Sequence, residues 1–222
     1  MKKREYIDVI CCDADGVVID LDKYQKWAFN DYYTKIGQPV PEIINPEAYD
    51  PSDIYGISKE LRFKIMSQYF PHYCQVARPR KDFLEMLRAF QLNGKKVNMV
   101  TARAMALDPK MGTTIQFWFG QWLYAFGDFV PDEIIFCSEE NSGLEKAEAC
   151  LKLIGNKGGI MYEDKPDNFD YLLDVCTTIG IRQPWNNGYI PPENAKYSYY
   201  LAKDSMETFL ITNEIDKGVR RK

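Results

Sequence analysis

The segment VICCDADGVVIDLD, residues 9–22, places two aspartates where an apolar run ends. Residues 6–12 read as a short buried strand, and Asp13, Asp15 and Gly16 follow it. Two carboxylates this close repel each other unless a cation lies between them, and the glycine allows a ligand to approach the backbone. On these residues alone, an aspartate-rich turn that merely caps the strand remains an alternative.

Composition limits the classes of function. A chain of 222 residues with 45% hydrophobic content can bury one sizeable core and a smaller appended unit. The net charge of −4, with a short basic tail at 219–222, argues against binding to double-stranded nucleic acid. Because no signal peptide or membrane-length apolar run is found, we expect a cytoplasmic protein with reduced, buried cysteines. Without a Cys-x-x-Cys pair, and with a lone His72, a thiolate or imidazole metal site is not expected.

Short apolar runs alternate with helical patterns along most of the chain. Beyond residues 6–12, strands are predicted at 96–100, 133–137, 159–162 and 177–181. Helices are predicted at 80–92, 113–126, 143–154 and 166–175. This alternation predicts an open parallel α/β sheet with helices on both faces, and such sheets bind ligands at the carboxyl ends of their strands.

Residues 22–77 interrupt that alternation. They contain two amphipathic helical patterns, at 24–36 and 58–70, joined by a proline-rich connector over 37–56. We therefore expect a core made of residues 1–20 and 78–222, and a helical insertion over residues 21–77.

Polar groups follow the other predicted strands at similar places. These groups are Thr101 and Ala102 after the second strand, Lys146 near the start of a helix, and Glu163, Asp164 and Asp167 after the fourth strand. Singly, the threonine could cap a helix, the lysine could be solvated, and the acids could form a capping turn. Together with Asp13 and Asp15 they are predicted to meet at one edge of the sheet.

This combination resembles the haloacid dehalogenase superfamily of phosphotransferases. Its four motifs match DADGV at Asp13, VTAR at Thr101, Lys146, and EDKPDN at residues 163–168. More narrowly, EDKPDN followed by IRQPWNNG resembles the 5'(3')-deoxyribonucleotidase family, although Glu163 stands where that family has an aspartate. The resemblance implies a three-layer Rossmannoid parallel sheet with a small helical cap inserted after the first strand.

The resemblance also implies a role for each residue. Asp13 would be the nucleophile that forms an aspartyl-phosphate, and Asp15 the general acid and base. Mg²⁺ would be held by the Asp13 carboxylate, the Asp15 backbone carbonyl and Asp164, supported by Glu163 and Asp167. The remaining three residues would bind phosphoryl oxygens. They are Thr101, the amide of Ala102, and Lys146, with Lys157 as the rival lysine.

The expected substrate is a small phosphomonoester, and nucleoside monophosphates are the first choice. Aromatic residues of the insertion could stack on a base or pack in the insertion's own core; they are Trp27, Phe29, Tyr32 and Tyr33. Two alternatives remain open: a phosphatase for sugar phosphates, other small phosphomonoesters or nucleic-acid phosphate ends, and a non-catalytic binding module on the same fold. The sequence leaves the oligomeric state open.

Overall fold

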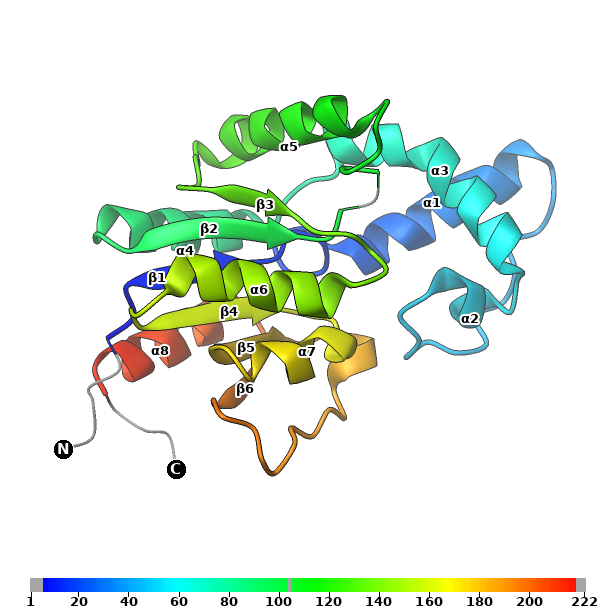
Figure 1. Cartoon of the computed structure of the whole chain (residues 1–222). Coiled ribbons are helices and arrows are strands. Elements are labelled where there is room, and N and C mark those ends of the chain that lie inside the picture. Colours follow the sequence, from blue (N-terminus) through cyan, green and yellow to red (C-terminus); the bar gives the residue numbers. More distant parts are fainter. Residues whose placement is uncertain (1–5, 104, 219–222) are drawn as a thin grey trace.

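A six-stranded parallel sheet forms the centre of the molecule (Figure 1). The computed structural model describes residues 6–103 and 105–218, so the basic tail at 219–222 lies outside the described residues. The strand order is β3-β2-β1-β4-β5-β6. The strands are β1 (Val9–Cys12), β2 (Lys96–Thr101), β3 (Ile134–Phe136), β4 (Gly159–Glu163), β5 (Thr177–Ile181) and β6 (Tyr199–Ala202). The predicted parallel α/β sheet is confirmed, and β6 is an additional strand that the sequence reading missed.

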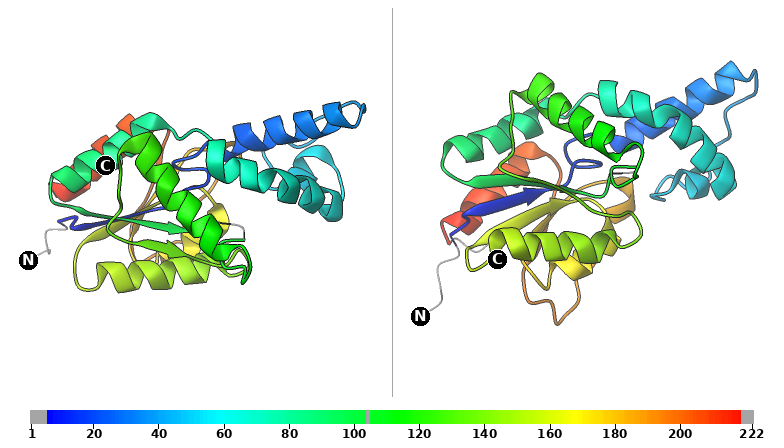
Figure 2. Two further views of the ribbon diagram at one scale, coloured as in Figure 1. Left: turned by 90° about the horizontal axis from the view of Figure 1, so that it is seen from above. Right: turned by 45° about the horizontal axis from the view of Figure 1, so that its top comes forward.

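Helices cover both faces of the sheet, which gives three layers (Figures 1 and 2). One face carries α4 (Lys81–Leu92), α5 (Gly112–Gly127) and α8 (Ser205–Asp216), and the other carries α6 (Ser142–Ile154) and α7 (Pro166–Leu172). Adjacent strand residues point to opposite faces, so Ile10 packs in the first layer and Cys11 in the second. Both are completely buried, as expected for a central parallel strand.

Residues 21–77, here called the cap segment, lie between β1 and β2 and contain three helices. They are α1 (Leu21–Lys35), α2 (Pro51–Tyr55) and α3 (Lys59–Val76). The two long helices start where side chains cap them: Asp20 accepts from the amide of Lys23, and Ser58 accepts from the amide of Leu61. Helices α1 and α3 contact each other and extend beyond the sheet (Figure 2). The short helix α2 lies in the connector and was not predicted.

Two neighbouring chain crossings join the cap segment to the sheet. Ile19 forms an isolated antiparallel bridge with Pro79, and the amide of Arg80 donates to the carbonyl of Val18 across 2.7 Å. The chain enters and leaves the cap segment at this pair of crossings, so a movement of the cap segment relative to the sheet would bend the chain here.

The cysteines are free and buried, as the sequence reading expected. Within the part of the chain that the structure describes, no helix is both long enough and apolar enough to span a bilayer.

Candidate active site

The carboxyl ends of β1, β2 and β4 open into a cavity of about 1040 Å³. Asp13 follows β1, Thr101 ends β2, and Lys146 projects from the second turn of α6; all three line the floor. The cap segment supplies much of the opposite wall. The structure therefore brings together residues that lie far apart in the sequence.

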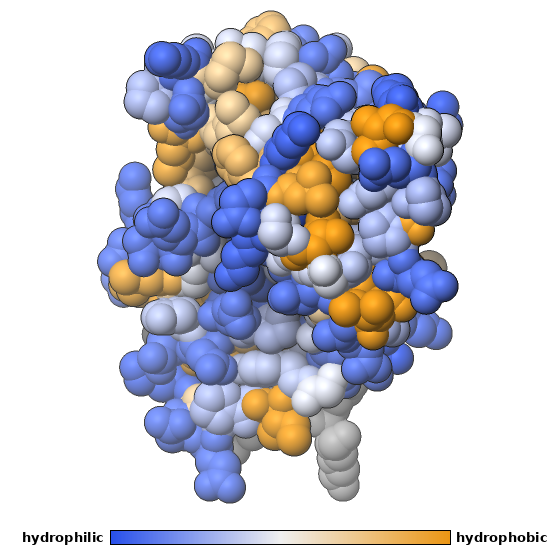
Figure 3. Space-filling view, turned by 90° about the vertical axis from the view of Figure 1, so that its right-hand side faces the viewer, coloured by the Kyte–Doolittle hydropathy of each residue, from blue (hydrophilic) through white to orange (hydrophobic). Residues whose placement is uncertain are grey.

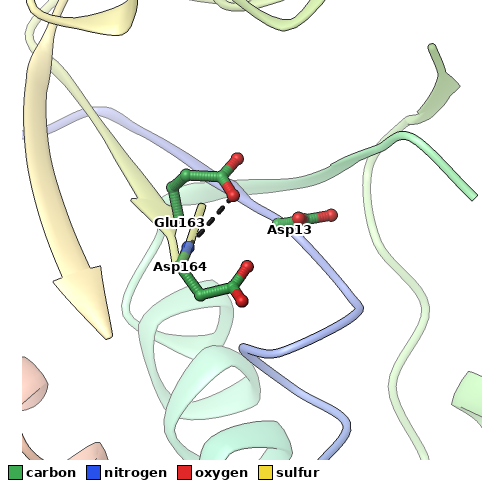
Figure 4. A group of neighbouring side chains, drawn as sticks. All are labelled: Asp13, Glu163 and Asp164. Atoms are coloured by element: carbon green, nitrogen blue, oxygen red, sulfur yellow. Dashed lines mark hydrogen bonds between the residues drawn. The ribbon is translucent and has the colours of Figure 1, made fainter. Parts of the chain in front are cut away.

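Three carboxylates form a cluster that includes Asp13 of this floor (Figure 4). Oxygens of Asp13, Glu163 and Asp164 all lie within 4.8 Å of one another, and each side chain is almost completely buried. The ammonium of Lys146 bridges two of them, at 2.6 Å from Asp13 Oδ2 and 2.7 Å from Glu163 Oε2. Glu163 also accepts from the backbone amides of Asp164 and Lys165. One lysine thus neutralises only part of the acidic charge.

Burial and neighbouring charges shift the pKa values of these three carboxyl groups in different directions. Burial raises the pKa of Asp13 to about 7, although Lys146 opposes the rise. Burial also raises the pKa of Asp164 well above its ordinary value, and the neighbouring Glu163 charge adds to this. For Glu163 burial acts in the same direction, but Lys146 and the two amides outweigh it and lower the pKa. A further positive charge beside Asp13 and Asp164 is therefore needed to keep both carboxyl groups ionised.

Two buried polar atoms beside the cluster have no hydrogen-bond partner among the residues that the structure describes. They are the hydroxyl of Thr101 and Oδ2 of Asp164. Unpaired buried polar atoms are costly, and a ligand or ion commonly pairs with them. Carboxylate oxygens are the donors that Mg²⁺ prefers, so the acidic cluster fits a divalent cation. Asp13 and Asp164 would hold it, because Asp13 lines the cavity and Oδ2 of Asp164 is unpaired, whereas both oxygens of Glu163 already accept hydrogen bonds from Lys146 and two backbone amides.

Gly16 is required by this arrangement. Its φ is +81°, and a Cβ atom at this position would lie 2.0 Å from Oδ2 of Asp164. Only glycine lets the loop after β1 approach the unpaired carboxylate oxygen so closely.

Asp15 lies apart from the three carboxylates. Its Oδ1 accepts a hydrogen bond from Arg103 across 2.8 Å and another from the hydroxyl of Tyr73. Arg103 is 2% exposed, and its guanidinium carbon lies 4.4 Å from the ring centroid of Phe119. The sequence reading missed both partners; Arg103 stood in the quoted VTAR motif, while nothing in the helical pattern of α3 distinguished Tyr73.

Support for Asp164 comes from the turn after β5, which the sequence reading noted only as part of IRQPWNNG. The backbone carbonyl of Asp164 accepts a hydrogen bond from Asn186 Nδ2 at 2.7 Å and another from Trp185 Nε1 at 3.2 Å. Gln183 Nε2 donates to the Gly16 carbonyl across 2.5 Å. This turn therefore holds the loops after β1 and β4 against each other.

The aromatic residues proposed to stack on a base lie elsewhere. Phe29 stacks on Tyr55 with ring centroids 4.8 Å apart, and Tyr32 and Tyr33 are buried in the same core. Trp27 lines a different groove. Different faces of α1 have different surroundings, and the sequence alone did not reveal which face borders the cavity. The rings that line it are Tyr49, Phe63, Phe70 and Tyr73.

The remaining predicted residues lie at the cavity edge or away from it. Ala102 and Asp167 line the cavity, and the side chain of Asp167 is 81% exposed, 3.8 Å from the ammonium of Lys165. Lys157, the rival lysine, is exposed just before β4, at the opposite end of that strand from Glu163.

Comparison with known proteins identifies the fold. No family model and no curated protein matches the chain, but solved structures do. A haloacid dehalogenase-like family hydrolase from Streptococcus pneumoniae is 16% identical, with a TM-score of 0.55 over 92% of this chain and 98% of its own. CbbY from Rhodobacter sphaeroides, solved with xylulose 1,5-bisphosphate, is 9% identical, with a TM-score of 0.56 over 90% and 95%.

A third structure limits what the fold can decide. Protein Tyrosine Kinase A from Mycobacterium tuberculosis is 16% identical, with a TM-score of 0.61 over 93% of this chain and 99% of its own. Proteins described as hydrolases and as a kinase thus share one architecture, and the reaction must be argued from the side chains. The chain has the fold of the haloacid dehalogenase-like hydrolases.

Proposed function

We propose that this protein is a phosphomonoester hydrolase in which Asp13 is the nucleophile. One observation carries the proposal: Asp13, bound to Lys146, faces the same cavity as the unpaired hydroxyl of Thr101 and lies beside the unpaired Asp164 oxygen. A carboxylate, a cation and a free hydroxyl at one point suit attack on phosphorus, because the phosphoryl oxygens need positive charge and donors around them.

The first half of the reaction transfers the phosphoryl group. A carboxylate oxygen of Asp13 forms a bond to phosphorus while the bond from phosphorus to the ester oxygen breaks. Asp15 donates its proton to the leaving oxygen, which departs as the alcohol. Thr101, the amide of Ala102 and Lys146 bind the transferring oxygens.

The second half hydrolyses the aspartyl-phosphate. Asp15, now a carboxylate, takes a proton from water as that water attacks phosphorus, and Asp13 leaves as a carboxylate. When bound, Mg²⁺ would neutralise charge on the phosphoryl oxygens. Its protein ligands would be Asp13, Asp164 and the backbone carbonyl of Asp15.

We infer that nucleoside monophosphates are the substrates and that the cap segment selects them. The EDKPDN and IRQPWNNG segments resemble the deoxyribonucleotidases, and the cavity of about 1040 Å³ exceeds the needs of a two- or three-carbon phosphoester. Phe63 is 67% exposed and Ile44 68% exposed, yet both line this cavity. Figure 3 shows the cap end of the molecule, where apolar residues form patches among hydrophilic ones. Apolar and aromatic walls favour a flat base over a bare sugar.

Phosphate release and intermediate trapping test the reaction. The protein should release phosphate from phosphomonoesters only with Mg²⁺, and acid quenching during turnover should trap phosphate covalently on the chain. Asp13→Asn should abolish both signals, because an amide does not attack phosphorus at a useful rate. Turnover by Asp13→Asn within about tenfold of the parent would exclude the covalent mechanism.

A substrate panel tests the specificity. We expect deoxynucleoside monophosphates, then ribonucleotides, to exceed sugar phosphates and an aryl phosphate in kcat/KM. Phe63→Ala should lower kcat/KM for nucleotides by about tenfold and leave aryl phosphate hydrolysis less affected. Phe117→Ala is the matched control, because Phe117 is 63% exposed on α5, outside the cavity. Faster turnover of sugar phosphates than of every nucleotide would refute the nucleotide preference alone.

A further inference from the structure

A second hollow of about 490 Å³ lies where the cap segment joins the sheet. We call it the hinge groove; it is lined by residues 19–27 and 72–80, which include both chain crossings. It is separate from the active-site cavity. On α1, Leu21 and Gln25 face the cavity, whereas Lys23 and Trp27 face the groove. Residues two apart on a helix point in nearly opposite directions, so α1 divides the two hollows.

An exposed aromatic pair forms part of the groove. The rings of Trp27 and His72 are stacked, with centroids 5.0 Å apart and planes 19° apart. Trp27 is 43% exposed, although neighbouring rings of α1, such as Phe29, are buried. The hydroxyl of Tyr24 lies 2.9 Å from His72 Nδ1, and it also donates to the carbonyl of Tyr69, so the imidazole is held in place. A flat, positioned ring surface therefore faces the groove.

Three cationic side chains line the same groove as this pair. Lys23 and Arg78 are exposed and, among the described residues, have no carboxylate partner. Arg80 has only distant partners, Asp20 at 4.0 Å and the carbonyl of Val17 at 3.5 Å. The groove thus carries three positive charges against one carboxylate, in a chain whose net charge is −4. Free cations around a ring surface suit a ligand that has both an anionic group and a planar ring.

We propose that the hinge groove binds a phosphorylated ligand with a planar ring, of the nucleoside-phosphate class, at a site distinct from the catalytic one. The ring stacks on Trp27, and the phosphate binds Lys23 and Arg78. This assignment does not depend on the reaction at Asp13, since no residue of the catalytic floor lines the groove.

The groove also has a physical connection to the acid–base candidate. Tyr24, which holds His72, packs against Tyr73 with ring centroids 4.7 Å apart, and Tyr73 donates to Asp15. A ligand that fills the groove contacts both crossings of the hinge, so it favours one position of the cap segment over others.

The single histidine gives a test specific to this site. Because His72 is the only histidine in the chain, the NMR signals of its ring are assigned at once to a position in the groove. Adenosine monophosphate is added to the full-length Asp13→Asn protein without Mg²⁺, so that no turnover occurs. We expect saturable shifts of the His72 signals. Adenosine alone and inorganic phosphate alone should each bind at least about tenfold more weakly.

A pair of double variants separates the groove from the active site. Lys23→Ala with Arg78→Ala should weaken binding at least about tenfold. Lys59→Ala with Lys64→Ala removes the same charge from exposed sites on α3 outside both hollows and should change nothing. Unmoved His72 signals at about 10 mM nucleotide would overturn the proposal. Shifts that persist unchanged without Lys23 and Arg78 would also overturn it, since the nucleotide then acts from the catalytic cavity. Equal binding of phosphate and nucleotide would overturn the role of the ring.

Discussion

Arg103 holds Asp15 across 2.8 Å, and a tyrosine of the cap segment, Tyr73, donates to the same carboxylate oxygen. The acid–base candidate is therefore shared between the sheet and the cap segment. The guanidinium carbon also lies 5.2 Å from the ring centroid of Tyr73 and 4.4 Å from that of Phe119, contacts that help to fix its position. We infer that the position of the cap segment controls how Asp15 faces a leaving oxygen.

Removing either partner should impair proton transfer more than binding. Arg103→Met should lower kcat by about tenfold or more with little change in KM, because Asp15 loses its orientation. Tyr73→Phe should show a smaller fall in kcat. Arg88→Met, at an exposed pair with Asp128, is the control. Equal falls in Arg88→Met and Arg103→Met would show a general loss of stability.

Two glycines with the same backbone angle separate strain from contact. Gly16 and Gly94 both have φ of +81°, but only Gly16 would place a Cβ atom against Asp164. Gly94→Ala should cost about 1–2 kcal/mol from the left-handed backbone alone and retain activity. Gly16→Ala should cost as much, displace the Asp164 carboxylate, and raise the Mg²⁺ concentration for half-maximal activity at least about tenfold. Identical Mg²⁺ titrations of the two variants would mean that Asp164 does not bind the cation.

The sequence predicted the sheet well because buried parallel strands are short apolar runs bounded by polar residues. Every predicted strand is present, but β6 was missed, since Tyr199 and Tyr200 are only partly buried and follow a polar stretch. Helix α8 was not predicted either, although the sequence contains a signal for its start. Asp204 caps the helix by accepting from the amide of Glu207, and this pairing of an acidic N-cap with a glutamate three residues later is typical of a helix N-terminus. These elements lie at one edge of the sheet, where local pattern is weakest.

The floor of the site was easier to predict than its surroundings. Asp13 and Asp164 directly follow strands and Thr101 ends one, so the positions of the strands place them, and Lys146 lies in the second turn of a predicted helix. Tyr73 lies inside a helix, and its contact with Asp15 depends on how α3 crosses the sheet edge. The prediction that aromatic residues of α1 face the cavity was wrong for the same reason, because helical spacing does not say which face of a helix packs against the rest of the molecule.

Lys146 should matter for both stability and activity. Lys146→Met leaves Asp13 and Glu163 as buried acids without their cation, so we expect a loss of about 3–5 kcal/mol and no turnover. Lys146→Met with Glu163→Gln should recover much of the stability and none of the activity. Lys157→Met, at an exposed position, should resemble the parent. Chemical unfolding and phosphate release measure the two effects, and an active double variant would refute the phosphoryl-binding role.

The stability of the metal-free protein should depend on pH through Asp13. Its pKa is raised from 3.8 to about 7 in the folded chain, so folding favours the protonated carboxyl. That contribution is complete below the ordinary pKa and is lost as pH rises through about 7. Asp164, whose pKa is also raised, acts in the same direction. Glu163 has a lowered pKa and loses its contribution only below its ordinary value of 4.5.

Mg²⁺ should reverse this loss, because it binds ionised carboxylates. We expect the rise in Tm on adding Mg²⁺ to be larger at about pH 8 than at about pH 5.5, a range that avoids the titration of Glu163. In Asp13→Asn, the metal-free Tm should fall less between these two pH values, because the amide does not ionise, and the Mg²⁺ effect should shrink. Thermal unfolding followed by circular dichroism, with Ca²⁺ and Na⁺ at matched ionic strength as controls, measures each change. An Mg²⁺ effect of equal size at both pH values would show that the cation binds outside the cluster of Asp13, Glu163 and Asp164.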